Sequence, residues 1–447
     1  MSKTPNFFCT DCGTEFNKWQ GQCHGCKAWN TIKEFKETKV SGTKTIQKGT
    51  DLSTTKPTVK PLNAKVRTST GFDEVDRVLG GGFFSGSFVL FGGTPGIGKS
   101  TLALQMFTNL KDALYFSGEE SAEQVLNRAQ RLNPSALDDL SERIFSTNSL
   151  EDILATVQTK QPPLIVIDSI QMVGLADSSF GSMSQIRENA EILLKLAKQD
   201  GITVLVIGHV TKNDEIAGPK VLEHMVDTVL KLEGEKNTEI RLLRSPKNRF
   251  GSTLEVGVFE MKTNGLAELK NPSEFFLAER PANAFGSAIT VVREGARNFL
   301  LEVQALTVKT NFGQPRRTSH GIDLSKFHLL LAVISKFTPF KCEEYDAYLN
   351  VVSGLRIKEP AADLAVMASI ISSRVEKEIP ATTVVLGEVG LSGEIRSVPF
   401  IENRLIEAAK LGFSKAIIPP LRGKKISIKN IQITEVKNIL ELTKALF

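Results

Sequence analysis

Short apolar runs of strand length alternate with helical patterns through the centre of this chain. Four such runs are Ser87–Phe91, Ala113–Phe116, Leu164–Asp168 and Thr203–Ile207, and helical stretches such as Leu102–Phe107 separate them. Strands that alternate with helices form a largely parallel, doubly wound sheet with helices on both faces. The pattern therefore predicts an α/β fold in which ligands bind at the carboxyl ends of the strands.

The pattern changes after about residue 270. Strand-like runs at Ala288–Val292 and Phe299–Leu306 are followed by helical ones at Ala361–Ser372 and Glu402–Leu411. We therefore expect a core α/β domain over residues 66–270 and a separate α/β domain over residues 271–447.

The segment before the core domain has a different composition. Between Lys39 and Lys60 there are five Lys, six Thr, one acidic residue and almost no large apolar side chains. Such a segment cannot bury a core, so residues 31–65 are expected to form a basic flexible linker. A solvated tether is favoured over a segment that touches phosphate.

Charge and composition exclude few function classes. The 447 residues carry 55 basic and 50 acidic side chains, a net charge of +5 that permits nucleic-acid binding without arguing for it. A hydrophobic fraction of 41% argues against a wholly disordered or fibrous chain. The apolar run Leu329–Ile334 is too short to span a membrane, and the first residues carry no apolar signal segment. We expect a cytoplasmic protein without a membrane partner.

Four of the five cysteines lie at the start of the chain. Cys9, Cys12, Cys23 and Cys26 form the pattern C-x2-C-x10-C-x2-C. Two C-x2-C knuckles can supply the four-sulfur shell that structural zinc prefers. Disulfides are rare in the cytosol, and a redox pair would not need duplication. Residues 1–30 are therefore predicted to form a zinc ribbon with these four ligands.

A phosphate-binding loop joins the first core strand to the first core helix. Residues Gly93–Ser100 match G-x-x-x-x-G-K-[ST] in the strand–loop–helix setting that this motif needs. Loop N–H groups and the helix N-terminus bind phosphate oxygens, Lys99 reaches the β and γ phosphates, and Ser100 binds Mg²⁺. The residues expected to bind ATP are Gly93, Thr94, Pro95, Gly96, Ile97, Gly98, Lys99, Ser100 and Thr101.

Polar residues end the other core strands. Asp168 follows a fully apolar strand and is the expected second Mg²⁺ residue. Glu119 and Glu120 follow the strand at 113–116, and one of them, preferably Glu119, orients and activates the attacking water. The alternative is that both only charge the first turn of the next helix. His209 and Thr211 are candidates for sensing the γ-phosphate.

Further motifs make a family resemblance specific. The four-cysteine pattern and the phosphate loop are accompanied by Thr70–Asp76, Ser117–Ser121, Gly208–Lys212 and Lys247-Asn-Arg-Phe-Gly251. In this order, over essentially the whole chain, they resemble the bacterial RadA (Sms) family of DNA-recombination and repair ATPases, which are RecA-like.

The resemblance implies a function. Members are DNA-dependent ATPases that form hexameric rings and move on single-stranded DNA, where they promote branch migration of recombination intermediates. It further implies a recombinase or another repair protein as partner. Lys247 and Arg249 would then act at the nucleotide of a neighbouring subunit, where a cation stabilises charge on the transferring phosphoryl group.

The resemblance also implies DNA-binding loops. Residues 174–187 and 213–224 would be mobile loops facing the ring channel, with Arg187, Lys212 and Lys220 as phosphate contacts. The early part of the last domain has a basic bias that could touch DNA or could be solvated surface. Its basic residues are Arg293, Arg297, Lys309, Arg316 and Arg317.

Residues 351–420 resemble the proteolytic domain of the Lon protease, which uses a Ser–Lys dyad. Alignment puts Ala361 where the serine should be and Asn403 near the position of the lysine. Protease activity is therefore not expected. A RecA-like ATPase that switches a protein partner, without motor action, stays open as an alternative, and DNA-stimulated ATP hydrolysis separates it from the motor.

Overall fold

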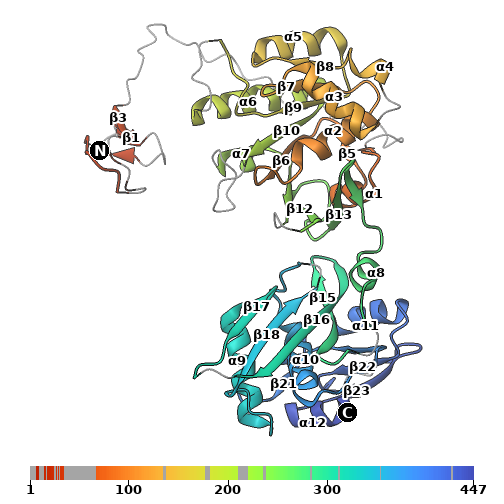
Figure 1. The fold of residues 1–447 in the computed structure, drawn as a ribbon. Coiled ribbons are helices and arrows are strands. Elements are labelled where there is room, and N and C mark those ends of the chain that lie inside the picture. The colour runs from red at the N-terminus through yellow and green to blue at the C-terminus, as the bar shows by residue number, and fades with distance from the viewer. Residues whose placement is uncertain are drawn as a thin grey trace. The chain divides into compact units, whose positions relative to one another are not determined.

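A computed structural model shows two compact units, residues 1–63 and 64–447 (Figure 1). The structure describes residues 7–9, 15–16, 18–24, 27, 29 and 31–34 of the first unit. In the second unit it describes residues 67–447 except 134–136, 177–181, 210–219, 235–237, 282–283, 311–312, 353 and 424–425.

The first unit contains a three-stranded antiparallel sheet in the order β2-β1-β3. Its strands are β1 (Phe7–Cys9), β2 (Glu15–Phe16) and β3 (Ile32–Glu34), the last lying past the expected end of the ribbon at residue 30. Phe16, Cys23 and Ile32 are buried together and form its small core.

The second unit begins with a nine-stranded sheet in the order β14-β13-β12-β11-β6-β10-β9-β7-β8. Its parallel strands are β6 (Phe88–Gly93), β7 (Leu114–Ser117), β8 (Ile144–Ser146), β9 (Leu164–Asp168), β10 (Thr203–His209) and β11 (Thr228–Glu233). Antiparallel strands β12 (Ile240–Asn248), β13 (Val256–Lys262) and β14 (Gly265–Glu268) extend one edge. A short ribbon pairs β4 (Arg67–Thr68) with β5 (Phe83–Phe84).

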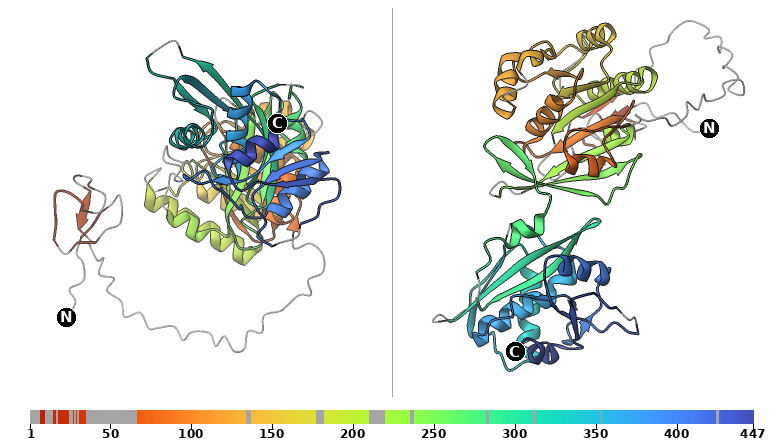
Figure 2. Two further views of the ribbon diagram at one scale, coloured as in Figure 1. Left: turned by 90° about the horizontal axis from the view of Figure 1, so that it is seen from below. Right: turned by 90° about the vertical axis from the view of Figure 1, so that its right-hand side faces the viewer.

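Helices cover both faces of this sheet (Figures 1 and 2). One apolar core joins one face to α1 (Asp73–Leu79), α2 (Lys99–Asn109) and α3 (Ala122–Leu132), near the short α4 (Leu137–Leu140). A second core joins the other face to α5 (Leu150–Lys160), α6 (Met183–Asp200) and α7 (Lys220–Met225). The predicted doubly wound α/β fold is confirmed.

The rest of the second unit has a seven-stranded sheet in the order β17-β18-β16-β15-β19-β22-β23. Its strands are β15 (Ser287–Glu294), β16 (Arg297–Lys309), β17 (Arg317–His320), β18 (Tyr345–Val351), β19 (Thr383–Val385), β22 (Lys415–Ile418) and β23 (Gln432–Glu435). The helices are α8 (Pro272–Leu277), α9 (Leu324–Phe337), α10 (Asp363–Val375), α11 (Ile401–Lys410) and α12 (Ile439–Leu446), with the 3-10 turn η2 (Pro360–Ala362) and a pair of two-residue strands, β20 (Glu388–Val389) and β21 (Ile395–Arg396).

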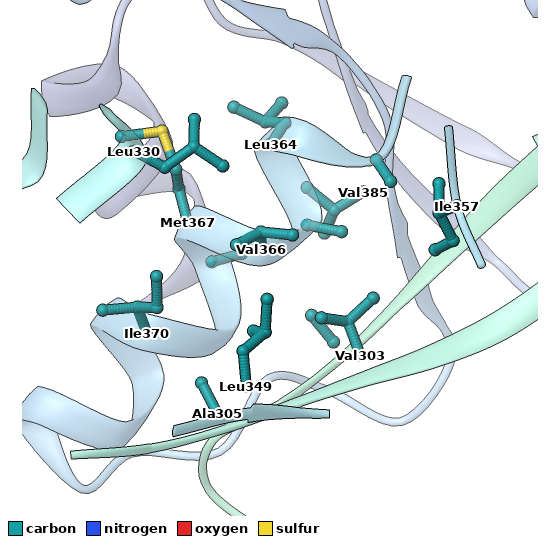
Figure 3. Packing of buried hydrophobic residues seen from close by; sticks show 14 of the residues in the cluster. Val303, Ala305, Leu330, Leu349, Ile357, Leu364, Val366, Met367, Ile370 and Val385 are labelled. Atoms are coloured by element: carbon teal, nitrogen blue, oxygen red, sulfur yellow. The ribbon is translucent and has the colours of Figure 1, made fainter. Parts of the chain in front are cut away.

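Helix α10 is the centre of this domain's core. Its side chains are buried almost all round: Val366 faces Val303 and Leu349 of the sheet, whereas Met367 lies beside Leu330 of α9 (Figure 3). A helix that is apolar on every face belongs in the interior.

Parts of both predicted channel loops are helical. Residues 183–187 form the start of α6, and residues 220–224 lie in α7. The Ser182 side chain accepts a hydrogen bond from the Gln185 backbone N–H, so it caps α6 earlier than the Ser- and Gly-rich composition indicates. In the part of the chain that the structure describes, no helix is both long and apolar enough to cross a membrane.

Candidate nucleotide-binding site

The phosphate loop connects β6 to α2 at the carboxyl end of the parallel strands. Gly96 and Gly98 have φ values of 79° and 112°, which L side chains rarely adopt. A Cβ on Gly98 would lie 2.7 Å from the Met261 methyl carbon, whereas at Gly96 it would face open space. The loop is therefore held against β13 on one side and is open on the other, as a phosphate cradle requires.

Lys99 is a buried cation in this loop. Its side chain is 4% exposed, and its Nζ donates hydrogen bonds to the Gly93 carbonyl at 2.8 Å and the Thr94 carbonyl at 3.1 Å. Burial lowers the pKa of Lys99, while the nearby carboxylates of Asp168 and Glu119 oppose that shift. A cation held mainly by carbonyl oxygens fits an anionic ligand such as the phosphates of ATP.

Asp168 ends β9 and is only 9% exposed. The buried Tyr115 hydroxyl donates a 2.7 Å hydrogen bond to its Oδ2. Burial, with the negative charge of Asp168, raises the pKa of Tyr115 well above its usual value, so the phenol stays a donor. Ser100, the second residue of α2, lies at the same end of the sheet. A hydroxyl and a carboxylate are oxygen ligands that Mg²⁺ accepts, so these residues fit the metal.

The two glutamates after β7 have different partners. Glu119 accepts a 2.8 Å hydrogen bond from the hydroxyl of Ser169, which follows Asp168. Glu120 instead forms an ion pair with Arg128 of α3. Ser121 caps α3 through a capping box with Gln124, so neither glutamate is the cap. Glu119 is therefore the glutamate that is linked to the Asp168 end of β9.

The sensor candidates lie at the end of β10. The backbone of His209 pairs with Gly93, which brings the strand end beside the phosphate loop. The His209 side chain, Thr211 and Lys212 lie outside the described part of the structure.

Lys247 and Arg249 lie at the opposite end of the sheet from the phosphate loop. Asn248 pairs with Thr228 of β11, and Thr228 pairs with Val89 near the start of β6, whereas the loop begins at Gly93. This separation is about 13 Å along the strand. The structure therefore does not bring these cations to the phosphate loop of their own chain.

Local contacts hold both cations in place. Lys247 Nζ donates to the carbonyls of Glu223 and His224 at 2.6 and 3.0 Å, and its pKa is lowered by burial and by Arg249. Arg249 is 57% exposed and lies 3.4 Å from the buried carboxylate of Asp227. The Arg249 guanidinium is therefore exposed at the surface of the chain, and its contact with Asp227 holds it in place.

The rest of the pentapeptide is packing. The Phe250 ring stacks on Phe84 with centroids 4.1 Å apart, and the Asn248 amide donates to the Leu79 carbonyl at 3.3 Å. A Cβ on Gly251 would lie 3.1 Å from that same carbonyl. The motif therefore clamps the β12 end against the loop after α1, which leaves Arg249 as its exposed functional group.

Sequence analysis missed three residues of this region. Asp227 is buried and accepts from the Phe88 backbone N–H, from Lys198 and from Arg249. Tyr115 and Ser169 hold Asp168 and Glu119. Tyr115 lies inside an apolar run that predicts only a strand, although a tyrosine hydroxyl in a buried strand needs a partner.

Several residues that were candidates for DNA contact interact with other protein groups in the structure. Arg187 pairs with Glu191 on the exposed face of α6, and the Lys220 side chain is not described. Three residues of the last domain have internal contacts: Arg293 lies over the Phe400 ring, Arg297 forms an ion pair with Glu74, and Arg317 donates to the Cys342 carbonyl. Lys309, at the end of β16, is exposed, and the Arg316 backbone N–H donates to Asp346.

The first unit fits zinc in the part that is described. Cys9 ends β1, and the Cys23 thiol is fully buried. The Lys27 N–H donates to the Cys23 carbonyl at 2.8 Å, and Lys27 has a φ of 62°. No group of three metal-ligating side chains occurs among the described residues, and Cys12 and Cys26 lie outside them.

The two positions that align with the Ser–Lys dyad of the Lon protease carry residues that cannot perform its chemistry. Ala361 is buried in η2, and Asn403 is exposed on α11. The next residue, Arg404, is 1% exposed and forms a two-armed ion pair with Glu359 at 2.6 and 2.7 Å. A methyl group and an internal ion pair therefore occupy this region.

Three family models match parts of the chain. A family of unknown function matches residues 67–259, the rubredoxin metal-binding domain matches residues 7–34, and subunit ChlI of Mg-chelatase matches residues 327–421. The rubredoxin-type match identifies the first unit as a zinc ribbon.

Similar proteins cover the whole chain. The DNA repair protein RadA of Bacillus subtilis (strain 168) is 45% identical over 99% of this chain and 98% of its own length. The DNA repair protein RadA of Escherichia coli (strain K12) is 42% identical over 98% of each.

Solved structures match less than half of the chain. The RadB recombinase covers 45% of the chain and 99% of its own length, with 24% identity and a TM-score of 0.36. A KaiC-like protein from the hyperthermophilic archaeon Pyrococcus horikoshii covers 45% of the chain and 98% of its own length, with 22% identity and a TM-score of 0.38.

Proposed function

Because this chain belongs to the RadA family of DNA repair proteins and is an ATPase that uses ATP, Mg²⁺ and Zn²⁺, we propose that it is a DNA-dependent motor. In this proposal ATP hydrolysis drives movement on single-stranded DNA in the cytoplasm and promotes branch migration of recombination intermediates. A recombinase or another repair protein would load or direct it.

One observation carries the enzymatic part of the proposal. Lys99 begins α2, Asp168 ends β9 and Glu119 follows β7, and the Ser169 hydroxyl donates to Glu119 at 2.8 Å, so both carboxylates lie at the same end of the sheet as the phosphate loop. Lys99 would hold the β and γ phosphates, Ser100 and Asp168 would hold Mg²⁺, and Glu119 would orient the attacking water. ATP with Mg²⁺ supplies the phosphoryl group, and the protein contributes position and charge.

The position of Arg249 supports a ring. Its guanidinium is exposed and lies at the sheet end away from the phosphate loop of its own chain. A closed head-to-tail ring repeats one contact, so one surface of each subunit meets a different surface of the next. In a homohexamer built this way, Lys247 and Arg249 would complete the nucleotide site of the neighbour.

The alternative is an ATPase that switches a protein partner and does not move on DNA. The same nucleotide residues would serve that function. A protease is disfavoured because Ala361 offers no nucleophile.

The experiment is steady-state ATP hydrolysis by the purified protein, with and without single-stranded DNA, at two salt concentrations. The motor proposal predicts that DNA stimulates hydrolysis and that higher salt weakens the stimulation, because cationic contacts to phosphate are lost as salt rises. Hydrolysis that is indifferent to DNA at both salt concentrations would favour the protein-switching ATPase.

A further inference from the structure

We propose that Tyr115 is a positioning residue for the magnesium site, which holds Asp168 so that one carboxylate oxygen stays directed toward the metal. The proposal rests on the proposed role of Asp168 as a magnesium residue. It adds a residue whose side chain has no expected contact with ATP and that the phosphate-loop motifs do not include.

Strand register explains how Tyr115 reaches Asp168. Strands β7 and β9 are parallel neighbours, with Ser117 opposite Asp168 and Tyr115 opposite Val166. Tyr115 is therefore two positions earlier than the direct partner of Asp168, on the same face of the sheet. A long aromatic side chain spans such a diagonal, and the Tyr115 hydroxyl reaches Asp168 Oδ2 at 2.7 Å.

The position is rigid. Tyr115 is 1% exposed, and its ring packs on Phe107 of α2 with centroids 5.5 Å apart. Helix α2 also carries Lys99 and Ser100 at its start. The Tyr115 ring thus contacts α2, the helix that follows the phosphate loop, and its hydroxyl contacts Asp168. The side chain therefore connects the phosphate-loop side of the site to the Asp168 side.

The hydrogen bond gives the two oxygens of the Asp168 carboxylate different roles. Oδ2 accepts from the phenol in a buried place, which fixes the rotation of the carboxyl group and leaves Oδ1 for the metal or its bound water. Partners that orient a ligating carboxylate typically change metal affinity about 10- to 100-fold when removed. A packing role alone would affect stability and leave the metal untouched.

The test is an equilibrium titration of Mg²⁺ into full-length protein mixed with a fluorescent ADP analogue. We expect Tyr115→Phe, which removes one hydroxyl and keeps the ring, to raise the half-saturating Mg²⁺ concentration about tenfold. Nucleotide binding without metal should stay as in the wild type. Tyr115→Met, which fills the space without a donor, should show the same shift and serves if the phenylalanine variant does not fold.

Two further variants make the result decisive. Phe116→Leu disturbs a buried ring on the opposite face of the same strand, which stacks on Phe145, and keeps the Tyr115 hydroxyl, so it should lower the melting temperature with no change in the Mg²⁺ midpoint. Asp168→Asn should itself weaken Mg²⁺, and adding Tyr115→Phe to it should have no further effect, because the two residues act as one unit.

The outcomes separate the inference from the proposed function. If Asp168→Asn weakens Mg²⁺ and Tyr115→Phe leaves the midpoint unchanged, the inference is wrong and the nucleotide site stands. If neither variant changes the midpoint, the role of Asp168 fails and the inference fails with it.

Discussion

Two buried cations, Lys99 beside the nine-stranded sheet and Arg404 beside the seven-stranded sheet, show how differently these two parts of the second unit use charge. Lys99 is held by two carbonyl oxygens, and burial lowers its pKa. Arg404 is paired with both oxygens of Glu359 and also donates to the carbonyls of Val291 and Pro399. Among the described residues the first cation forms hydrogen bonds to carbonyl oxygens and no direct ion pair, so it can accept an anionic ligand, whereas the second is already neutralised inside the protein. A buried charge therefore indicates a binding site only when its partners are incomplete.

The largest expected effect is on Lys99. Lys99→Ala removes the cation proposed to hold the phosphates, and we expect ATP hydrolysis to fall to the uncatalysed background, measured as phosphate release. Without nucleotide the variant should melt close to the wild type, because no tight ion pair is lost. Lys111→Ala, a change at an exposed lysine just past α2, is the matched control. Hydrolysis at the wild-type rate in Lys99→Ala would remove the assignment of the site.

The next effect concerns the exposed Arg249. We expect Arg249→Ala to retain ATP binding and to lose hydrolysis about 10³-fold, as for a cation supplied across an interface. Mixing this variant with Lys99→Ala should restore part of the activity, because an intact site then forms between unlike subunits. Arg396→Ala, at another exposed arginine, should change nothing.

The mixing result is the critical one for Arg249. Native mass spectrometry would verify that mixed rings have formed. If such mixed rings recover no ATP hydrolysis, Arg249 does not act on a neighbouring subunit.

Arg404 should matter for stability and not for binding. Arg404→Met removes the cation paired with the Glu359 carboxylate, which keeps the hydrogen bond from the Arg293 backbone N–H, and we expect a loss of about 3 kcal/mol. For a domain of this size that corresponds to a melting temperature lower by roughly 6–12 °C in calorimetry. Arg396→Met breaks only a surface pair with Glu394, which solvent screens, and should leave the melting temperature nearly unchanged. Equal losses in the two variants would contradict the view of Arg404 as an internal brace.

The smallest effect is a pH dependence at the start of α10. Burial raises the pKa of Asp363 to about 6, although Lys326 lies 2.7 Å away and opposes the shift. The folded protein thus binds this proton more tightly than the unfolded chain, so the stabilisation is complete below about pH 4 and is lost as the pH rises through 6. The melting temperature of the wild type relative to Asp363→Asn should therefore fall between about pH 4 and pH 7. A difference that stays constant over this range would contradict burial as the cause.

The residues proposed to bind ligands are easier to predict from the sequence than those that support them. The phosphate loop follows from one motif, and Asp168 follows from its place at the end of an apolar strand. Tyr115 and Asp227 could not be predicted, because their roles depend on which strands are neighbours and in what register. The separation between Arg249 and the phosphate loop depends on the same register.

The last domain gives a second example. Alignment predicted that the dyad chemistry is missing at Ala361 and Asn403. It could not predict that Arg404 carries a buried ion pair, because Glu359 is distant in sequence and meets it only after α11 packs on the sheet.

Branch migration of a synthetic three-stranded DNA junction tests the central claim most directly. With the full-length protein, the account predicts strand exchange in the presence of ATP and none with a non-hydrolysable ATP analogue or with Lys99→Ala. Exchange that proceeds equally well with the analogue, or no exchange while DNA still stimulates hydrolysis, would contradict a motor that moves on single-stranded DNA.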